Sequence, residues 1–306
     1  MCIFGFWLVR YTTVMETARS RYLIINSDDY GYSVSINKGI ANAFEQNIIT
    51  NTSLLANGEC FDDAITRARD GSYTDKIGLH ANITEGKPLG GPYNTLTDER
   101  GNFLGIRTLI LKEFNKQIDE EEVREEISLQ IKQCRENGIE LSHIDTHQWS
   151  QVIPCIADAI EEASTEYGIR FIRNINETYI LKNFLGASLK GVTNSIGLSV
   201  LNTIFNNKRD RPRMVMPDFY HGVLLMGHTD LIHALMRVIE NLPYGTSELM
   251  CHISSDTYDD LANRTSYARA RYKEFEALSS KEFKETVSRN NVQLVSYRDI
   301  EAEFKE

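Results

Sequence analysis

The chain has 306 residues, 42% hydrophobic and 25% charged, a composition typical of a globular protein with a sizeable core. Its formal net charge is −10 and no stripe of Lys and Arg stands out, so we expect no nucleic acid partner. The cysteines are odd in number and form no CxxC pair, which argues against a disulfide framework and favours a reducing compartment, the cytoplasm: Cys2, Cys60, Cys134, Cys155 and Cys251.

The N-terminal residues lack the features of a targeting or membrane segment. The apolar run from Cys2 to Val9 is too short to span a bilayer, and it has neither the basic start nor the cleavage site of a secretory signal. We therefore expect no membrane partner. Met15 lies just before the first convincing strand, so residues 1–20 are predicted to be an N-terminal extension and a candidate for disorder. Residues 21–306 are predicted to form a single domain.

From residue 21 onward, hydrophobic periodicity alternates between strand and helix. The first part of the chain predicts, in order, a strand at 21–27, a helix at 33–46, a strand at 48–56, a short helix at 61–69 and a strand at 76–83. Ser33 or Ser35 is expected to cap the first of these helices. The Gly- and Pro-rich segment 84–105 predicts a long loop with a functional role.

The second part of the chain continues this alternation. It predicts a helix at 120–137 closed by Gly138, a strand at 139–146, a helix at 153–167 closed by Gly168, and a strand at 169–173. The stretch 174–217 is weakly patterned, with a helix at 192–205. A helix at 229–240, a strand at 248–253, helices at 266–278 and 281–289, and a strand at 292–297 follow. The alternation predicts an α/β fold with a parallel sheet or barrel.

Asp and His residues collect at the ends of four of the predicted strands. In chain order they are Asp28 and Asp29; His80; His143, Asp145 and His147; and His252. Because the carboxyl ends of parallel strands share one edge, where α/β enzymes build their active sites, we expect these side chains to meet. Imidazole and carboxylate groups are ligands of first-row metals, so the pattern predicts a divalent metal site.

The segment "HIDTH" carries three of these residues. In an extended chain His143, Asp145 and His147 share one side, and a helix would also bring the two histidines together; the flanking pattern favours the strand. A carboxylate beside a ligating histidine can also orient it from the second layer. Alone, a double Asp is usually a turn or cap, and a strand-end histidine is usually a core residue. Their common edge favours the metal site.

Four ordered motifs make the chain similar to a known family. "LIINSDDYGYSVSINKGIANAFEQNIITNTSLLANG", "IGLHANITEGKPL", "HIDTHQ" and "ELMCHIS" together span nearly the whole chain. In this order they resemble the YdjC-like carbohydrate deacetylases. The resemblance implies a (β/α) barrel, TIM-barrel-like but distorted. It also implies metal-dependent hydrolysis of the N-acetyl group of an amino sugar or a short N-acetylated oligosaccharide.

The same resemblance assigns roles to individual residues. It implies one divalent ion, Mg²⁺ or Zn²⁺, held by Asp29, His80 and His147. Asp28 would be the general base and His252 the general acid. Arg173 would lie near the site and pair with Asp28. Beside these residues, Asp145 and His143 of the "HIDTH" segment are candidates for supporting the site or binding substrate. The partner would be the small sugar substrate, and a homodimer is left open.

The third motif departs from the family. Many members continue it with further histidines, whereas this chain has Gln148 and Trp149. The ligand position His147 is kept, so the departure concerns the substrate pocket, where the large Trp149 ring could stack on a sugar face.

Two alternatives remain beside the deacetylase. Another metal-dependent barrel enzyme, such as a sugar isomerase or a phosphoesterase, would also gather Asp and His at the sheet edge, but the order of the motifs argues against it. A non-catalytic sugar-binding relative is disfavoured because every residue of the implied reaction centre is present.

Overall fold

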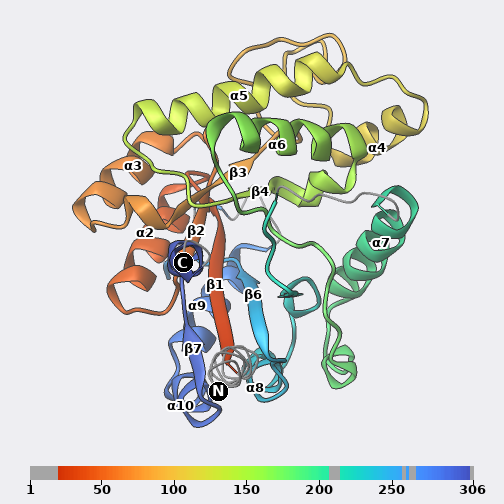
Figure 1. The fold of residues 1–306 in the computed structure, drawn as a ribbon. Helices are drawn as coiled ribbons and strands as arrows, with labels where there is room; N and C mark the ends of the chain where they lie inside the picture. Colours follow the sequence, from red (N-terminus) through yellow and green to blue (C-terminus); the bar gives the residue numbers. More distant parts are fainter. Residues whose placement is uncertain (1–19, 207–213, 257–259, 262–266, 304–306) are drawn as a thin grey trace, which may run out of the picture.

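The computed structural model describes residues 20–206, 214–256, 260–261 and 267–303. The predicted extension over residues 1–20 lies outside this part of the chain, except for Ser20. In the described part, helices and strands alternate along the sequence, and the strands of the main sheet pair in parallel (Figure 1). The α/β class is therefore confirmed.

The sheet is centred on a long first strand, β1. The strands are β1 (Arg21–Tyr30), β2 (Asn51–Leu54), β3 (Ile77–Ala81), β4 (Ile144–Thr146), β5 (Phe219–His221), β6 (Gly245–Cys251) and β7 (Val292–Leu294). They are ordered β4-β3-β2-β1-β6-β5. One edge of β1 pairs with β6, and the other is shared, with β7 along its first residues and β2 along its last. Because Leu23, Ile24 and Ile25 are fully buried, β1 forms the middle of the core.

The sheet is a half barrel, so the expectation of a TIM-like barrel holds only in part. Between β4 and β5 the described chain continues the curve as isolated bridges, of which Ile144–Ile172 and Phe171–Val215 are two. The predicted strand at 169–173 is reduced to these bridges. Just beyond it, the Asn174 side chain accepts a hydrogen bond from the Asn176 backbone and donates one to the Pro217 carbonyl. Side-chain amides that bond to the backbone in this way compete with a regular ladder.

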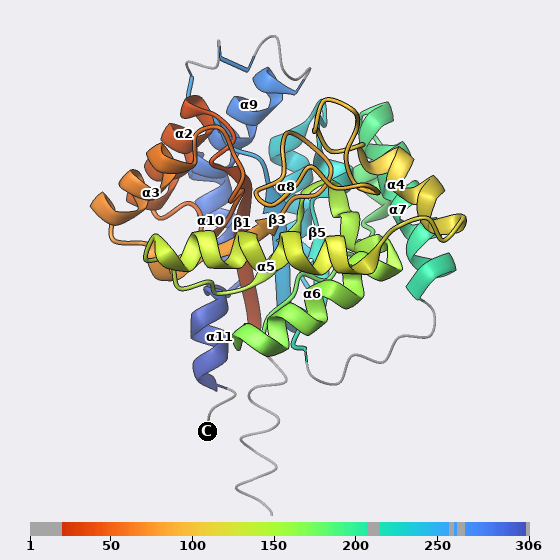
Figure 2. The same ribbon diagram turned by 90° about the horizontal axis from the view of Figure 1, so that it is seen from above.

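Helices surround the strands (Figure 2). They are α2 (Val34–Glu45), α3 (Phe61–Asp70), α4 (Ile106–Phe114), α5 (Glu120–Glu136), α6 (Pro154–Tyr167), α7 (Leu189–Asn206), α8 (Leu231–Glu240), α9 (Ala268–Ser279), α10 (Lys281–Arg289) and α11 (Tyr297–Glu303). The eight predicted helices are confirmed with shifted ends. The sequence did not predict α4, α11 or β5. The last predicted strand ends early, at Leu294, because Tyr297 begins α11.

Local sequence signals explain where α2 begins and where α6 ends. The Ser33 hydroxyl caps α2 by accepting a hydrogen bond from the Ile36 backbone at 3.2 Å, which decides between the two predicted caps. Gly168 ends α6 with a φ of 68°, a left-handed conformation that glycine adopts without steric cost.

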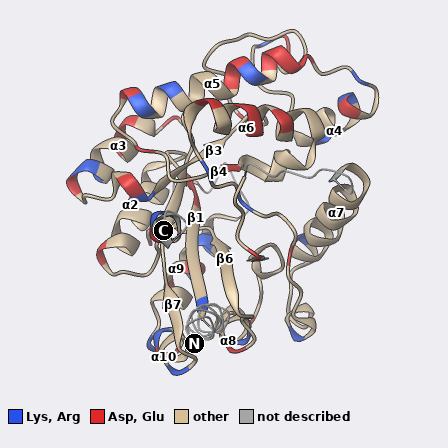
Figure 3. Ribbon diagram, in the orientation of Figure 1, with Lys and Arg blue, Asp and Glu red and all other residues tan. Residues whose placement is uncertain are grey.

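Surface composition differs between the helices. Charged residues gather on helices such as α3 and α5, whereas α7 has almost none (Figure 3). Among the described residues, no helix combines the length and the apolar character needed to cross a membrane.

Candidate active site

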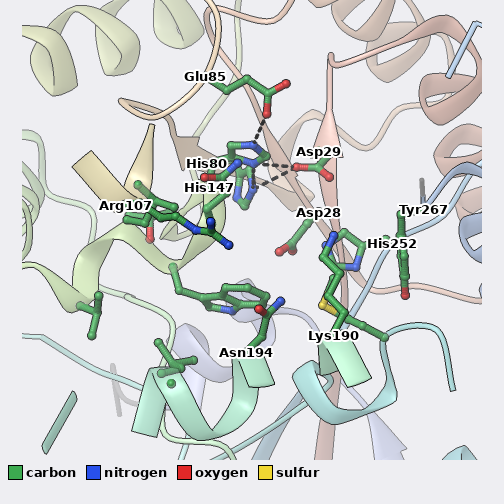
Figure 4. Close-up of a pocket in the computed structure, with 18 of the residues that line it drawn as sticks. Asp28, Asp29, His80, Glu85, Arg107, His147, Lys190, Asn194, His252 and Tyr267 are labelled. Carbon is green, nitrogen blue, oxygen red and sulfur yellow. Dashed lines mark hydrogen bonds and ion pairs between the residues drawn. The ribbon is translucent and has the colours of Figure 1, made fainter. Parts of the chain in front are cut away.

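A pocket of about 570 Å³ lies at the carboxyl ends of β1, β3, β4 and β6 (Figure 4). This volume is in the range of small-molecule sites. Six residues predicted from the sequence line it: Asp28, Asp29, His80, His147, Trp149 and His252. The helices α4 and α7 form other walls, with Arg107 from the former and Asn194 from the latter. The predicted meeting of Asp and His at one edge of the sheet is thus confirmed for five residues: Asp28, Asp29, His80, His147 and His252.

Asp29, His80 and His147 form a compact triangle of ligand atoms. Asp29 Oδ1 lies 3.3 Å from His80 Nε2 and 3.0 Å from His147 Nδ1, and the two nitrogens are 3.3 Å apart. Ligands bound at ~2.1 Å and at right angles to one ion are about 3.0 Å apart, so the triangle fits a shared cation. Asp29 Oδ1 is buried and makes no hydrogen bond within the described chain. A bound cation would give this oxygen the partner that it lacks.

Each histidine of the triangle is also held by a carboxylate on its other ring nitrogen. His80 Nδ1 lies 2.7 Å from Asp145 Oδ1, and His147 Nε2 lies 3.1 Å from Glu85 Oε2. The Tyr32 hydroxyl donates to the other oxygen of Glu85 at 2.8 Å. Such carboxylates commonly fix the tautomer and orientation of metal-binding histidines. Asp145 and Glu85 therefore occupy the second layer of the candidate metal centre.

The carboxylates around the triangle favour positive charge at its centre. Although burial acts in the opposite direction, the Arg271 guanidinium and His147 hold the pKa of Asp29 well below its usual range. Burial would lower the pKa of His80, but the Asp145 carboxylate raises it to about 10. Against burial again, Asp29 raises the pKa of His147. Without a metal, protons on the imidazoles therefore balance the carboxylates, and a cation would replace them.

Asp28 has a different partner from its neighbour. Arg173 holds it through two hydrogen bonds, from Nη1 to Oδ2 at 2.7 Å and from Nη2 to Oδ1 at 2.6 Å, so the predicted Arg173–Asp28 contact is confirmed. Burial raises the pKa of Asp28, and Arg173 opposes this shift. The same guanidinium pairs with Asp145 and Glu248. It therefore supplies the positive charge between Asp28 and Asp145, and this cluster does not need a metal.

His252 follows β6 and faces the same space as Asp28 (Figure 4). Its backbone N–H donates to Glu274 Oε2 at 2.7 Å, while its buried Nδ1 has no hydrogen-bond partner in the described chain. Burial, and then the nearby Arg271 charge, lower the pKa of His252 to about 3. The imidazole is therefore neutral at neutral pH.

Trp149 reaches the pocket through an unusual backbone. The short 3₁₀ segment His147–Val152 contains Gln148 and Trp149 with φ of 55° and 54°, a left-handed conformation uncommon outside glycine. The Trp149 indole N–H donates to the Tyr220 hydroxyl at 2.9 Å, which fixes the ring at the pocket wall. This is the segment in which the chain departs from the family motif.

His143 is not brought to the pocket. Its ring is buried between Ser142 and Ser53, whose hydroxyls lie 2.9 Å from Nδ1 and 3.1 Å from Nε2, and it stacks on Tyr297 with centroids 4.0 Å apart. The expectation that it shares a side with His147 fails because β4 ends at Thr146 and the chain turns into the 3₁₀ segment. Ser53 also donates to Asp145, so His143 supports the site only at a distance.

Sequence reasoning missed Glu85 and two residues of α9, Arg271 and Glu274. Glu85 lies in the loop 84–105, for which the sequence predicts a functional role but no particular residue. A stripe along α9 at intervals of four, three and four residues places two charged side chains on a buried face: Tyr267, Arg271, Glu274 and Leu278. Charged residues in the buried stripe of a helix were the available signal.

Comparisons with known proteins found a family model and relatives that match most of this chain. The family model described as "YdjC-like protein" matches residues 22–289. A carbohydrate deacetylase of Clostridium beijerinckii is 30% identical over 285 residues, covering 91% of this chain and 99% of that protein. One of Xenopus laevis is 30% identical over 252 residues, covering 80% and 78%. A crystal structure of a proposed cellobiose-phosphate cleavage protein of Enterococcus faecalis has the same fold, with a TM-score of 0.71, 23% identity and coverage of 92% and 99%.

Proposed function

Because this chain belongs to the YdjC-like family, we propose that it is a metal-dependent carbohydrate deacetylase that hydrolyses the N-acetyl group of an amino sugar or a short N-acetylated oligosaccharide. The observation that carries the proposal is the Asp29–His80–His147 triangle beside Asp28 in one pocket. The curated relatives named as carbohydrate deacetylases support the reaction class. We further propose that residues 21–306 form one deacetylase domain.

The triangle would hold one divalent ion, with Asp145 and Glu85 behind the histidines. When bound, this ion supplies Lewis-acid chemistry: it polarises the acetyl carbonyl and lowers the pKa of a water molecule. Two imidazole nitrogens and one carboxylate are the donors that Zn²⁺ prefers, while Mg²⁺ prefers oxygen ligands. The donor set thus favours Zn²⁺ over Mg²⁺, and both belong in the test.

Asp28 would act as the general base. It lines the pocket next to the triangle, and burial raises the pKa of its carboxyl group, which makes it a better proton acceptor. Arg173 holds both carboxylate oxygens and so fixes the side chain for the attack of water. The amide bond cannot break without a proton on the departing nitrogen.

His252 would deliver that proton. Because its pKa is about 3, it is neutral before the reaction and must first receive a proton. The proton that Asp28 takes from water is the one available in the pocket, and both side chains face the same space. Asp28 would take one proton from water and pass it to His252, which would give it to the departing amine. Trp149 would offer its ring face to the sugar.

The test is acetate release. Purified protein is incubated with N-acetylglucosamine, diacetylchitobiose and a panel of nucleotide sugars, after loading with Zn²⁺, Mg²⁺ or Co²⁺ and after chelation. We expect acetate from at least one substrate, and only with metal. Absence of acetate from the whole panel with every metal would contradict the proposal, and so would equal release after chelation.

A further inference from the structure

Arg271 has more hydrogen-bond donors than the described structure satisfies. It lies in the first turns of α9, is 7% exposed and lines the pocket. Its Nη2 pairs with Asp29 Oδ2 at 2.5 Å. Its Nε and Nη1 are buried and make no hydrogen bond within the described chain. Since a buried charged donor without an acceptor is costly, an acceptor from outside the protein is expected there.

The surroundings of Arg271 show where that acceptor would lie. Oδ1 of Asp29 faces the two histidines while Oδ2 faces Arg271, so a single carboxylate separates the guanidinium from the candidate metal position. The charge of Arg271 contributes to the lowered pKa of His252, whose Nδ1 also lacks a partner. The Tyr267 ring lies 5.8 Å from the guanidinium carbon. This wall of the pocket therefore presents several unsatisfied nitrogens beside the place where a substrate would react.

We propose that Arg271 binds the oxygen of the acyl group under hydrolysis and, after the reaction, the carboxylate of the released acid. The proposal rests on the proposed function and adds a residue to it. Amide hydrolysis builds negative charge on the acyl oxygen and ends with a carboxylate. A guanidinium is permanently charged and donates from fixed positions, so it suits both species.

A purely electrostatic role for Arg271 makes a different prediction. If it served only to balance Asp29, one donor and one positive charge would suffice, and lysine could replace it. If it binds the acyl oxygen, the additional N–H groups are required and lysine cannot supply them from the same positions. The variants Arg271→Lys and Arg271→Met separate the two roles. The matched control is Arg67→Lys, in the Arg67–Asp63 pair of α3, outside the pocket.

The binding experiment uses acetate as the probe. Sodium acetate is titrated by calorimetry into the Zn²⁺-loaded full chain at constant ionic strength, and Zn²⁺ affinity is measured by chelator competition. We expect Arg271→Lys to keep its Zn²⁺ affinity but to bind acetate at least tenfold more weakly. Arg271→Met should lose both, and Arg67→Lys neither. Acetate binding by Arg271→Lys equal to that of the wild type, or no acetate binding by the wild type, would overturn the inference.

Turnover gives a second readout. With an accepted N-acetylated sugar, Arg271→Lys should lower kcat by about 100-fold with little change in KM, as expected for a donor to a developing oxyanion. The two proposals fail separately. Acetate binding that depends on Arg271, in a protein that hydrolyses no N-acetylated sugar, supports the carboxylate site and contradicts the deacetylase. Full turnover by Arg271→Lys supports the deacetylase and overturns the role of Arg271.

Discussion

Two neighbouring aspartates of one strand line the same pocket, although adjacent residues of a regular strand face opposite sides. Asp29 has a φ of 69°, and the pairing of β1 with β2 shifts register between Ser27 and Tyr30. Aspartate tolerates this left-handed conformation better than most residues. The irregularity brings both carboxylates to the pocket, where Arg173 holds one and the histidines face the other. The different neighbours of the two carboxylates therefore underlie their different proposed roles, metal ligand for Asp29 and general base for Asp28.

Asp28→Asn tests the division of labour between the two aspartates. The amide keeps the shape but cannot accept the proton, so we expect kcat to fall by about 100-fold or more while metal affinity stays close to that of the wild type. His80→Ala should instead lose metal. Acetate release and chelator competition measure the two effects, with the exposed Asp62→Asn as control. Full activity of Asp28→Asn would show that another group is the base.

Glu85 is expected to matter for metal binding although it is not one of the three proposed ligands. Its carboxylate accepts from His147 Nε2 at 3.1 Å and so selects the tautomer in which Nδ1 is free to bind. Losing such a contact typically costs about 10–100-fold in metal affinity, and we expect this range for Glu85→Ala. Glu99→Gln, in the same loop, is the control. Equal Zn²⁺ affinities for Glu85→Ala and the wild type would exclude this role.

At the scale of elements, the 3₁₀ segment His147–Val152 holds a pair of left-handed residues next to a proposed ligand. Each such residue costs about 1 kcal/mol or more in the absence of glycine. This strain accompanies the fixed position of the Trp149 ring against Tyr220. The backbone of this segment is therefore strained, while the Trp149 side chain has a fixed position.

Gln148→Gly should therefore stabilise the protein. Gln148 is exposed, and glycine adopts its φ of 55° freely, so we expect the free energy of unfolding to rise by about 1 kcal/mol. The same substitution inside a right-handed helix, Gln133→Gly in α5, should lower it by roughly 0.5–1 kcal/mol. Urea unfolding measures both. Destabilisation by both variants would mean that the backbone at Gln148 carries no relievable strain.

Elements with one apolar face could be predicted from the sequence. Elements whose backbone is bonded by side chains could not. The helix α5 follows from periodicity, and its end follows from Gly138, which has a φ of 80° just after the cap residue Asn137. The half barrel does not, because after Arg173 the Asn174 side chain accepts a hydrogen bond from the Asn176 N–H and donates one to the Pro217 carbonyl. The motif residues of the site were found because they end strands. Arg271 comes from a helix stripe, and only the fold reveals that this stripe faces Asp29.

At the scale of the whole molecule, burial of histidines links stability to pH. Burial lowers the pKa of His143 to about 3, below the value of about 6.5 in an unfolded chain. Between these values the unfolded state binds the extra proton. The contribution of His143 to stability is therefore complete above about pH 6.5 and is lost as the pH falls toward 3.

His143→Gln should flatten this dependence. In metal-free protein, we expect the slope of the free energy of unfolding between about pH 4 and 6 to decrease by up to about 1.4 kcal/mol per pH unit relative to the wild type. The control is Gln117→Asn, at an exposed position, which changes no titratable group and should leave the slope unchanged. Denaturant unfolding at several pH values provides the measurement. An unaltered slope in His143→Gln would show that His143 is not buried in its neutral form.

The shared edge of β1 has a consequence for how the protein is made. Residues 21–30 leave the ribosome early, and β2 follows soon. The strands β6 and β7, which pair with residues 21–27 and 21–23 of β1, are synthesised only near the end of the described chain. Until then the apolar Leu23–Ile25 run lacks its neighbours and is exposed to aggregation. His252 and Arg271 are also late. A growing chain therefore carries both aspartates long before it can assemble a working centre around them.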